Sequence, residues 1–509
     1  MKRNLPVIIL LLFAFTYSWG QQRYLSEVFT SYQKIKDSVY AKNFEVLTGA
    51  PVLKDLKCDI YLPPASDTAQ ARPLIIMLHT GNFLPKYINQ SATGYKDDSA
   101  TIEICKRLAM RGYVVCAPAY RQGWNPAGST VDIRRGTIMN AVYRGMQDAK
   151  AAIRYMRKNA ALYKIDENKV VIGGQGTGAY IAMGCAYVDR IAETRYSKFI
   201  NSSTNQPYID TALVADIDGI TAGVINYVNN PTYSSKVNMI FNLGGAIGDI
   251  NWMEKGEIPV VGFHSYTDPF APDTSGMIYV PGTTPQPVIP ADGNRNVCRT
   301  ANTLGLNNDW KIASFKDAYS VASKINNEGI EGYYRFKIAP GGAQAAPWEW
   351  WDSTTTVAVG TPTYMAFGYS AAAAAAAATQ CHTNGLLTNQ LMSKTKAVAY
   401  IDTILNYLSP RMMVALKING YMQFMGIEKS RGEVKFAVYP NPTRDIVNVK
   451  AESEIQHVTL TDISGREVLT LSNSQTDAVS FGKGTLAPGL YIIRIKTADG
   501  EAVQRLVIE

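Results

Sequence analysis

The chain has 509 residues, 46% of them hydrophobic and 18% charged, with a formal net charge of +8 at pH 7. This length allows two to four domains with sizeable cores. The charge is mild for the length, and no Lys/Arg-rich block with interleaved aromatic residues occurs, so nucleic acid is not indicated as a partner.

The first twenty residues have the pattern of a secretory signal peptide. Lys2 and Arg3 form a charged start, Leu5–Phe15 is a short apolar stretch, and Ser18–Gly20 supplies small residues for cleavage. Cleavage there would make Gln21 the first mature residue. The apolar stretch is too short to span a membrane comfortably, and no later stretch reaches about eighteen apolar residues. No transmembrane segment is therefore expected after the signal is removed.

The elements that follow alternate between helices and apolar strands. Residues 23–50 are expected to form a helix and a short polar lead-in. Strands are predicted at Lys57–Leu62, Pro73–His79, Tyr113–Ala117, Val170–Ile172, Val237–Leu243, Ile258–His264 and Tyr333–Ile338. Helices are predicted at Ala100–Arg111, Ile138–Asn159 and Ser393–Leu408, the last stopped by Pro410. This alternation predicts an α/β fold with βαβ units and a mostly parallel central sheet.

A glycine-dense turn joins the apolar run Val170–Ile172 to a helical pattern that begins at Tyr180. The turn reads Gly174-Gln175-Gly176-Thr177-Gly178. Glycine is needed where a strained turn packs a helix against a strand without room for a Cβ. A tight turn with no chemistry is one interpretation of this stretch.

A dinucleotide fold is a second interpretation, because Gly174, Gly176 and Ala179 nearly fit its glycine pattern. That fingerprint normally opens its βαβ unit and requires an acidic residue about 20 positions later. Glu193 is near that distance but lies in a polar, helical pattern rather than at a strand end. A P-loop is excluded, because no Lys-Ser or Lys-Thr follows the glycines.

The turn also resembles the nucleophile elbow of α/β-hydrolases, Gly-x-Ser-x-Gly, with Gly176 in the place of the serine. His79-Thr80-Gly81-Asn82-Phe83 is similar to the His-Gly-Gly-x-Phe turn of esterases. Leu108–Val115, followed by Tyr120-Arg121, resembles the matching carboxylesterase segment. The resemblance implies an oxyanion hole formed at Thr80, Gly81 and Thr177.

The same resemblance extends to the other two members of a catalytic triad. Asp268 follows a predicted strand in a turn similar to the one that carries the acidic member, although Asp-Pro also initiates turns by itself. A histidine is expected shortly after the last strand, and this chain has Gln344 there. His382, in a predicted loop, is the alternative base. The nucleophile and the base are thus both replaced, while the acid remains.

Two classes of function follow from these residues. The first is a secreted carboxylesterase-like protein with impaired or lost serine-hydrolase activity that binds a small ester or saccharide at the cell surface. The second is an active ester hydrolase that uses other residues, such as His382. Neither class requires a cofactor or a metal ion. If the first is right, serine at 176 and histidine at 344 should restore hydrolysis only together, because triad members act as a unit.

Six cysteines in so long a chain do not form a disulfide scaffold. Four of them lie in apolar strand or helix patterns. Cys298 and Cys381 lie in polar segments that are expected to be loops, Cys298 within a cap-like, loop-rich insertion at 270–312. In an oxidising compartment these two form the predicted bridge.

The C-terminal region changes to short alternating strands, which predict a small Ig-like β-sandwich. Val438–Pro442 and Leu486–Tyr491 closely resemble the C-terminal sorting domain of the type IX secretion system, and a generic carbohydrate-binding module is the alternative. The resemblance implies export across the outer membrane of a Bacteroidota-like cell, with the secretion machinery as partner. The predicted domains are a signal peptide at 1–20, an α/β-hydrolase-like domain at 21–425, a linker at 426–435 and the sorting domain at 436–509.

Overall fold

The computed structural model describes residues 22–47, 49–280, 284–338, 341–425, 436–497 and 500–509. The predicted signal peptide at 1–20 and the predicted linker at 426–435 lie outside the described residues. The chain divides into two compact units, Met1–Met425 and Gly426–Glu509, which are described separately below.

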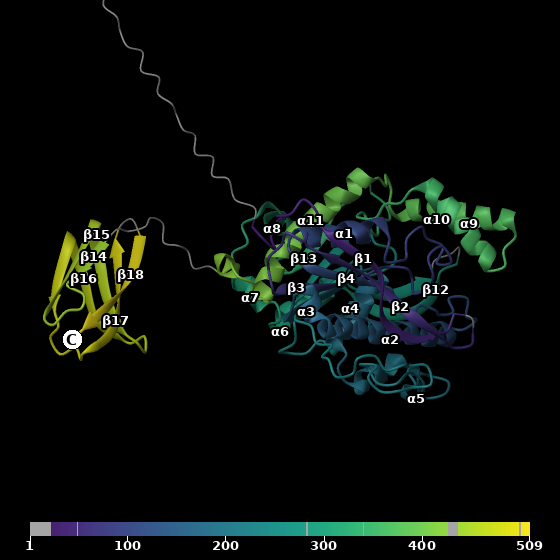
Figure 1. Cartoon of the computed structure of the whole chain (residues 1–509), viewed down its shortest axis with the longest axis horizontal. Coiled ribbons are helices and arrows are strands. Elements are labelled where there is room, and N and C mark those ends of the chain that lie inside the picture. Colours follow the sequence, from purple (N-terminus) through teal and green to yellow (C-terminus); the bar gives the residue numbers. More distant parts are fainter. Residues whose placement is uncertain (1–21, 48, 281–283, 339–340, 426–435, 498–499) are drawn as a thin grey trace, which may run out of the picture. The chain divides into compact units, whose positions relative to one another are not determined.

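The large unit is built on an eight-stranded sheet (Figure 1) with the order β1-β2-β4-β3-β5-β8-β10-β13. Strand β2 pairs antiparallel with β1 and with β4, and every other pair of neighbours is parallel. The strands are β1 (Gln33–Glu45), β2 (Val52–Leu62), β3 (Arg72–Leu78), β4 (Val114–Pro118), β5 (Ile165–Gln175), β8 (Met239–Leu243), β10 (Val260–Ser265) and β13 (Tyr333–Phe336).

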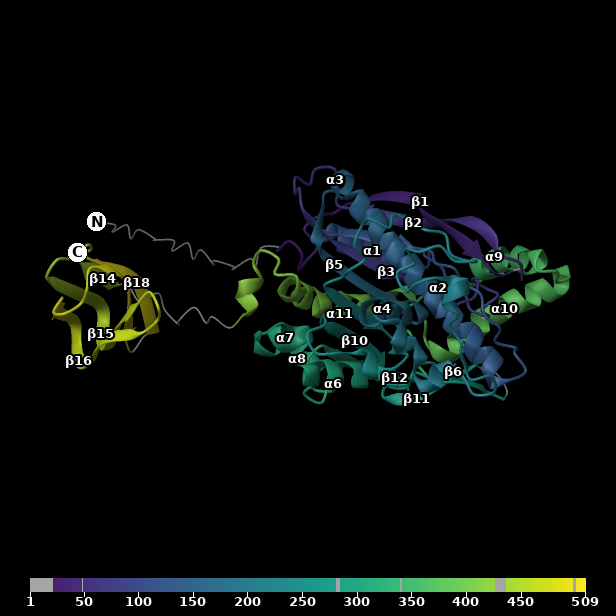
Figure 2. The same ribbon diagram turned by 90° about the horizontal axis from the view of Figure 1, so that it is seen from below.

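Helices cover both faces of this sheet (Figure 2), because the central strands are apolar on both sides. Ile76, Ile172 and Ile240 pack in one core cluster, whereas their neighbours Ile75 and Val171 pack in the other. The first cluster lies under α2 (Val131–Lys158) and α4 (Thr177–Tyr187), and the second under α1 (Ser99–Met110) and α11 (Lys394–Ala415). This layered arrangement and strand order confirm the predicted α/β-hydrolase fold.

Shorter elements lie in the connections between the main strands and helices. They are α3 (Ala160–Tyr163), η1 (Ile191–Arg195), η2 (Ser197–Phe199), β6 (Ile200–Asn201), β7 (Gln206–Pro207), α5 (Thr211–Val214), β9 (Ala246–Ile247), η3 (Ile250–Trp252), β11 (Ser275–Val280), β12 (Gln286–Gly293), α6 (Asn294–Leu304), α7 (Asn308–Ile312), α8 (Ala318–Ser323), α9 (Ser353–Ala366), α10 (Ala371–Thr388) and η4 (Tyr421–Phe424). The alanine run forms the first half of α10. The region 270–312, expected to be rich in loops, instead contains β11, β12, α6 and α7.

Two predicted elements are wrong in kind or extent. The helix expected within 23–50 is replaced by the edge strand β1, which pairs with β2 through most of its length. Helix α11 is capped by Ser393, the first residue of the predicted range, but continues through Pro410 to Ala415. The guanidinium of Arg111 donates hydrogen bonds to the carbonyl oxygen of Leu405 and to the hydroxyl of Ser409, which satisfies polar groups next to this proline.

The C-terminal unit consists of five antiparallel strands: β14 (Phe436–Tyr439), β15 (Ile446–Asp462), β16 (Glu467–Gly482), β17 (Gly489–Thr497) and β18 (Gly500–Ile508). Alternate side chains of the strands point into one apolar core, which includes Val447, Val449, Leu460, Ile493, Ile495 and Leu506. The all-β character predicted from the alternation is therefore confirmed.

Candidate active site

The glycine-dense turn connects β5 directly to α4, and Gly176 stands at its tip. Gly176 has φ +49° and ψ −117°, a conformation that residues with a side chain rarely adopt. A Cβ on Gly178 would lie 2.4 Å from the carbonyl oxygen of His79, and one on Gly174 would lie 2.5 Å from the carbonyl carbon of Gly178. The neighbouring Gln175 is buried and donates a hydrogen bond to Thr101 Oγ1 (2.9 Å) at the start of α1. Main-chain contacts thus require a glycine at 174 and at 178.

The space beside Gly176 is occupied by Thr80, which follows the end of β3. A Cβ on Gly176 would lie 2.5 Å from Thr80 Oγ1 and 3.4 Å from Thr80 Cβ. Thr80 also stands where the His-Gly-Gly-x-Phe pattern has its first glycine. The two departures from the hydrolase motifs are therefore adjacent in space: residue 176 lacks a hydroxyl, and the hydroxyl of Thr80 lies close to the position where a side chain at 176 would begin.

The residues predicted to form the oxyanion hole lie around this point. Gly81 has φ +136°, and a Cβ there would lie 2.9 Å from Gly94 Cα, so the loop that contains Gly94 packs directly on this turn. Thr177 is the first residue of α4, and its N–H has no acceptor within the helix. Its Oγ1 lies 3.3 Å from the hydroxyl of Tyr120.

Asp268 follows β10. It is linked to the elbow by residues at the end of β8, which lie next to both. Its Oδ1 accepts hydrogen bonds from the N–H groups of Phe270 (2.7 Å) and Ala271 (3.2 Å). Its Oδ2 lies 3.7 Å from the position of a Cβ on Gly244, whose neighbour Leu243 accepts a hydrogen bond from Gly176 N–H. Burial raises the pKa of Asp268 above its usual value, and the same two backbone N–H groups partly oppose this.

Gln344 is fully buried, and its side chain is held by α11. Its backbone N–H donates to the carbonyl oxygen of Thr267, which places it next to Asp268 in the main chain. Its Oε1, however, accepts a hydrogen bond from Lys396 Nζ (3.4 Å) in the first turn of α11. Among the described residues, its Nε2 has no hydrogen-bond partner.

Trp348 lies in the same connection between β13 and α11 as Gln344, and its side chain reaches the end of β8. Its Cη2 lies 3.4 Å from the position of a Cβ on Gly244, the same glycine that Asp268 approaches. From the sequence, Thr80 was expected only to contribute to the oxyanion hole. The signal for Thr80 was present, since it replaces a glycine of the family motif, but nothing in the sequence indicated where Trp348 would lie.

His382 does not lie in a loop, as predicted, but in helix α10. Its Nδ1 accepts a hydrogen bond from Trp351 Nε1 (3.0 Å), which fixes the ring against that indole. His79 is buried, stacks on Tyr120 with ring centroids 4.3 Å apart, and has its pKa lowered to about 4 by burial. His264 is also buried and bonds through Nε2 to the carbonyl oxygen of Ala271 (3.2 Å).

The predicted bridge between Cys298 and Cys381 is not formed, and both residues are free, buried thiols. Cys298 packs in α6 against Ile330 and Tyr333. Cys381 packs in α10, where its thiol lies 3.4 Å from the hydroxyl of Tyr364. The prediction failed because both segments form helices that bury their thiols in separate apolar clusters.

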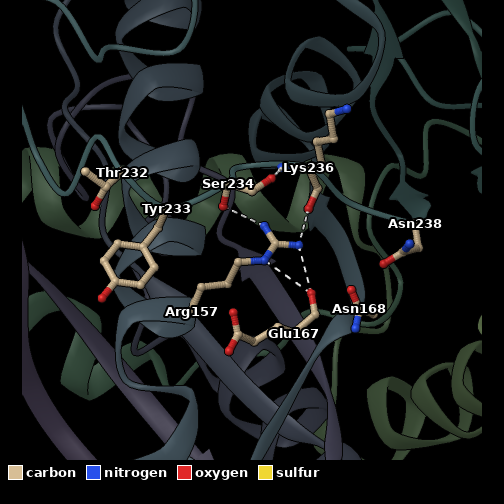
Figure 3. A pocket seen from close by; sticks show the side chains of 8 residues that line it. All are labelled: Arg157, Glu167, Asn168, Thr232, Tyr233, Ser234, Lys236 and Asn238. Atoms are coloured by element: carbon tan, nitrogen blue, oxygen red, sulfur yellow. Dashed lines mark hydrogen bonds between the residues drawn. The ribbon is translucent and has the colours of Figure 1, made fainter.

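A pocket in the large unit (Figure 3) is lined by residues at the opposite ends of the strands from the elbow. Its lining includes Arg157 from α2, Glu167 near the start of β5, and the segment before β8. The Arg157 guanidinium donates hydrogen bonds to the carbonyl oxygens of Glu167, Ser234 and Lys236. With its donors committed to the backbone, Arg157 has a structural role there.

The described residues contain no group of three His, Cys, Asp or Glu side chains that could hold a metal ion. Within the same described ranges, no helix is long and apolar enough to cross a membrane.

The strand order and the elbow define an esterase-like α/β-hydrolase domain. Residues 58–274 match the model of the family described as BD-FAE, and residues 437–509 match the one described as secretion system C-terminal sorting domain. The chain therefore contains a BD-FAE domain and a type IX sorting domain, and it is secreted or presented at the cell surface. The BD-FAE match includes the elbow and Asp268 but ends before Gln344 and His382.

Several solved structures of Thermogutta terrifontis esterase 2 are similar to this chain. The form phosphorylated by paraoxon is 20% identical with a TM-score of 0.29, and the match covers 47% of this chain and 72% of that one. The butyrate-bound form is 19% identical with a TM-score of 0.30, covering 47% and 74%. No curated protein matches the chain.

Proposed function

We propose that the large unit is an esterase-like protein that has lost ordinary serine-hydrolase chemistry and binds a small ester or saccharide at the cell surface. The observation that carries this proposal is the pair of substitutions that meet at the elbow. Gly176 offers no nucleophile, and Thr80 Oγ1 lies 2.5 Å from where the missing side chain would begin. A serine at 176 would therefore fit only after the Thr80 hydroxyl had moved away.

The chemistry of acyl transfer supports the same conclusion. A covalent intermediate requires an oxygen or sulfur nucleophile hydrogen-bonded to a base. Gln344 carries no base, and His382 is bonded to Trp351 on α10. Removing such a nucleophile lowers turnover by about a millionfold, although an oxyanion hole and binding pocket leave about a thousandfold over water.

A fluorophosphonate probe and a panel of activated short-chain esters test this proposal on the full chain. We expect no covalent labelling and no hydrolysis beyond the slow rate that a pocket alone provides. Stoichiometric labelling would contradict the proposal, and its loss in either Thr80→Ala or His382→Ala would identify the residue responsible. A thermal-shift screen with short esters and oligosaccharides then measures binding directly.

We further propose that residues 1–20 are removed as a signal peptide and that the source cell is of the Bacteroidota type. The sorting domain, matched over residues 437–509, supports this proposal. Deleting residues 436–509 should leave the large unit folded but retained in the periplasm. Normal release of the truncated protein into the medium would contradict this role for the C-terminal unit.

A further inference from the structure

The connection between β13 and α11 includes a long segment without charge. No Asp, Glu, Lys or Arg occurs between Asp352 and Lys394, although 50 basic and 42 acidic residues are distributed over the 509 residues of the chain. Helices α9 and α10 make up most of this segment and lie side by side at one end of the large unit (Figures 1 and 2). We refer to the two helices and the turn between them as the hairpin.

The hairpin buries only one narrow stripe from each helix. The buried residues are Thr356, Gly360 and Tyr364 in α9 and Ala374, Ala378 and Cys381 in α10. A Cβ on Gly360 would lie 2.9 Å from the Cβ of Ala378, so the helices approach closely along these stripes. Every other face of both helices is at least partly exposed to solvent.

The exposed faces carry apolar side chains. Phe367 is 52% exposed and Tyr369 is 49% exposed in the turn that joins the helices, and Met365 lies beside them at the end of α9. We call these three residues the hairpin tip. A helix of a soluble protein normally presents charged residues to water, and one without a charged face is normally buried. The hairpin has no charged face and is not buried by the described chain.

We propose that the hairpin tip docks on an uncharged lipid surface and inserts Met365, Phe367 and Tyr369 at the level of the headgroups. No charge in the segment has to be removed from water, a step that is costly in hydrocarbon. Aromatic side chains with a polar atom, such as Tyr369, are favoured at this level of a bilayer. Because no described helix can cross a membrane, the contact is peripheral.

Export gives the hairpin access to such a surface, since the chain is delivered across an outer membrane. The absence of charge also selects the kind of surface. Attraction to anionic lipids requires clusters of Lys or Arg, and the segment has neither. Docking of the tip depends on export but not on the loss of hydrolase chemistry.

The hairpin is fixed to the loop that covers the oxyanion turn. The hydroxyl of Tyr364 donates to the carbonyl oxygen of Tyr87 (2.6 Å), and Asn384 Nδ2 donates to that of Gln90 (3.3 Å). In the same loop, Asn89 Nδ2 donates to the carbonyl oxygen of Gly81 (3.3 Å). Docking of the tip would therefore hold this edge of the sheet close to the lipid.

Co-sedimentation of the full chain with phosphatidylcholine vesicles tests the proposal. We expect binding that does not weaken between about 0.1 and about 0.5 M salt, a range in which attraction between charges would be increasingly screened. The double variant Phe367→Ser/Tyr369→Ser should bind at least about tenfold more weakly, because it removes the aromatic area that enters the headgroup layer. Tyr279→Ser on β11 removes a tyrosine of equal exposure, 49%, and should leave binding unchanged. The apolar stretch Leu5–Phe15 is common to all variants, so only differences between them are compared.

A second variant tests the location without removing the tip. Phe367→Trp should bind like the parent, and its emission, taken as the difference from the parent, should shift to shorter wavelength and be quenched by brominated lipid. Equal binding by the parent and the double variant, or an unquenched signal from the introduced indole in bound protein, would overturn the proposal. Absence of vesicle binding together with tip-dependent dimers in light scattering would overturn it in favour of a second copy of the chain.

Discussion

The connections after β5 and after β13 both start where parallel strands of the sheet end. The first is a tight turn, whereas the second is a long and open loop. The β5 turn is closed by main-chain contacts that exclude any Cβ at Gly174 and Gly178. The β13 connection contains Gly341, around which nothing lies within 4 Å of an added Cβ, and then extends into the hairpin. The turn geometry is therefore set by the glycines on either side of its tip, whereas the position of a base depends on the path of a loop.

The largest expected effect is a difference in stability between glycine-to-alanine substitutions in the two connections. Gly178→Ala should lower the free energy of unfolding by about 3 kcal/mol or more, because its Cβ would meet the carbonyl oxygens of His79 and Leu78, which cannot move aside. Gly341→Ala should change it by less than about 0.5 kcal/mol. Chemical denaturation measures both variants, and equal losses would remove the distinction between the two connections.

The next effect concerns activity. Contrary to the expectation from the sequence alone, Gly176→Ser combined with Gln344→His should stay inactive, because the serine would lie too close to Thr80 Oγ1 and residue 344 is directed toward Lys396. Adding Thr80→Ala clears the space. With that background, a base introduced as Trp348→His should hydrolyse a nitrophenyl ester about a hundredfold faster than one introduced as Gln344→His.

This expectation depends on Trp348 and Asp268 approaching the same glycine, Gly244. Each variant should first be shown to melt like the Gly176→Ser/Thr80→Ala parent. A faster rate for the histidine at 344 would show that the base position follows the sequence motif rather than the observed loop path.

A smaller effect depends on pH and on Glu349, which lies in the β13 connection and accepts a hydrogen bond from Thr93 Oγ1 (3.1 Å). Burial, with the nearby Asp98 carboxylate, raises the pKa of Glu349 to about 8. The folded state then keeps a proton that the unfolded state loses above its ordinary pKa, so this residue lowers stability as the pH rises toward 8. Glu349→Gln should therefore gain about 1–3 kcal/mol over the parent as the pH rises from about 4.5 to about 9, which denaturant titration at each pH measures.

The control for this prediction has the opposite sign. A hydrogen bond from the Arg295 guanidinium lowers the pKa of Glu328, so its stabilising contribution is present above the ordinary glutamate pKa and is lost in acid. Glu328→Gln should therefore lose stability relative to the parent at neutral pH and lose nothing in acid. Parallel pH profiles for the two variants would contradict the assignment of Glu349.

The smallest effect concerns the end of the β13 connection. Ser393 Oγ accepts a hydrogen bond from Lys396 N–H (3.1 Å) and caps α11, whereas the N-cap of α4, Gly176, has no side chain to form such a bond. Ser393→Ala should cost about 1 kcal/mol in the free energy of unfolding. A change below the error of denaturant titration would indicate that α11 is held by its buried face alone.

The fold and the elbow could be predicted because their signals are local. Continuous apolar runs such as Leu74–Leu78 specify buried parallel strands, and a cluster of glycines specifies the turn. Strand β1 was missed because most of its side chains are exposed at the sheet edge, so no apolar alternation marks it. The contact between Thr80 and Gly176 could not be predicted, because it joins two strand ends through the direction of one side chain.

Fully buried thiols have a consequence for how the chain reaches its native state. Five of the six free cysteines are buried, and burial raises the pKa of the thiols of Cys105 and Cys298, which leaves little reactive thiolate. The unfolded chain exposes all six to the oxidising conditions met during export. Folding and oxidation are therefore competing reactions. Refolding yield should rise with added reductant, while the native protein should need none.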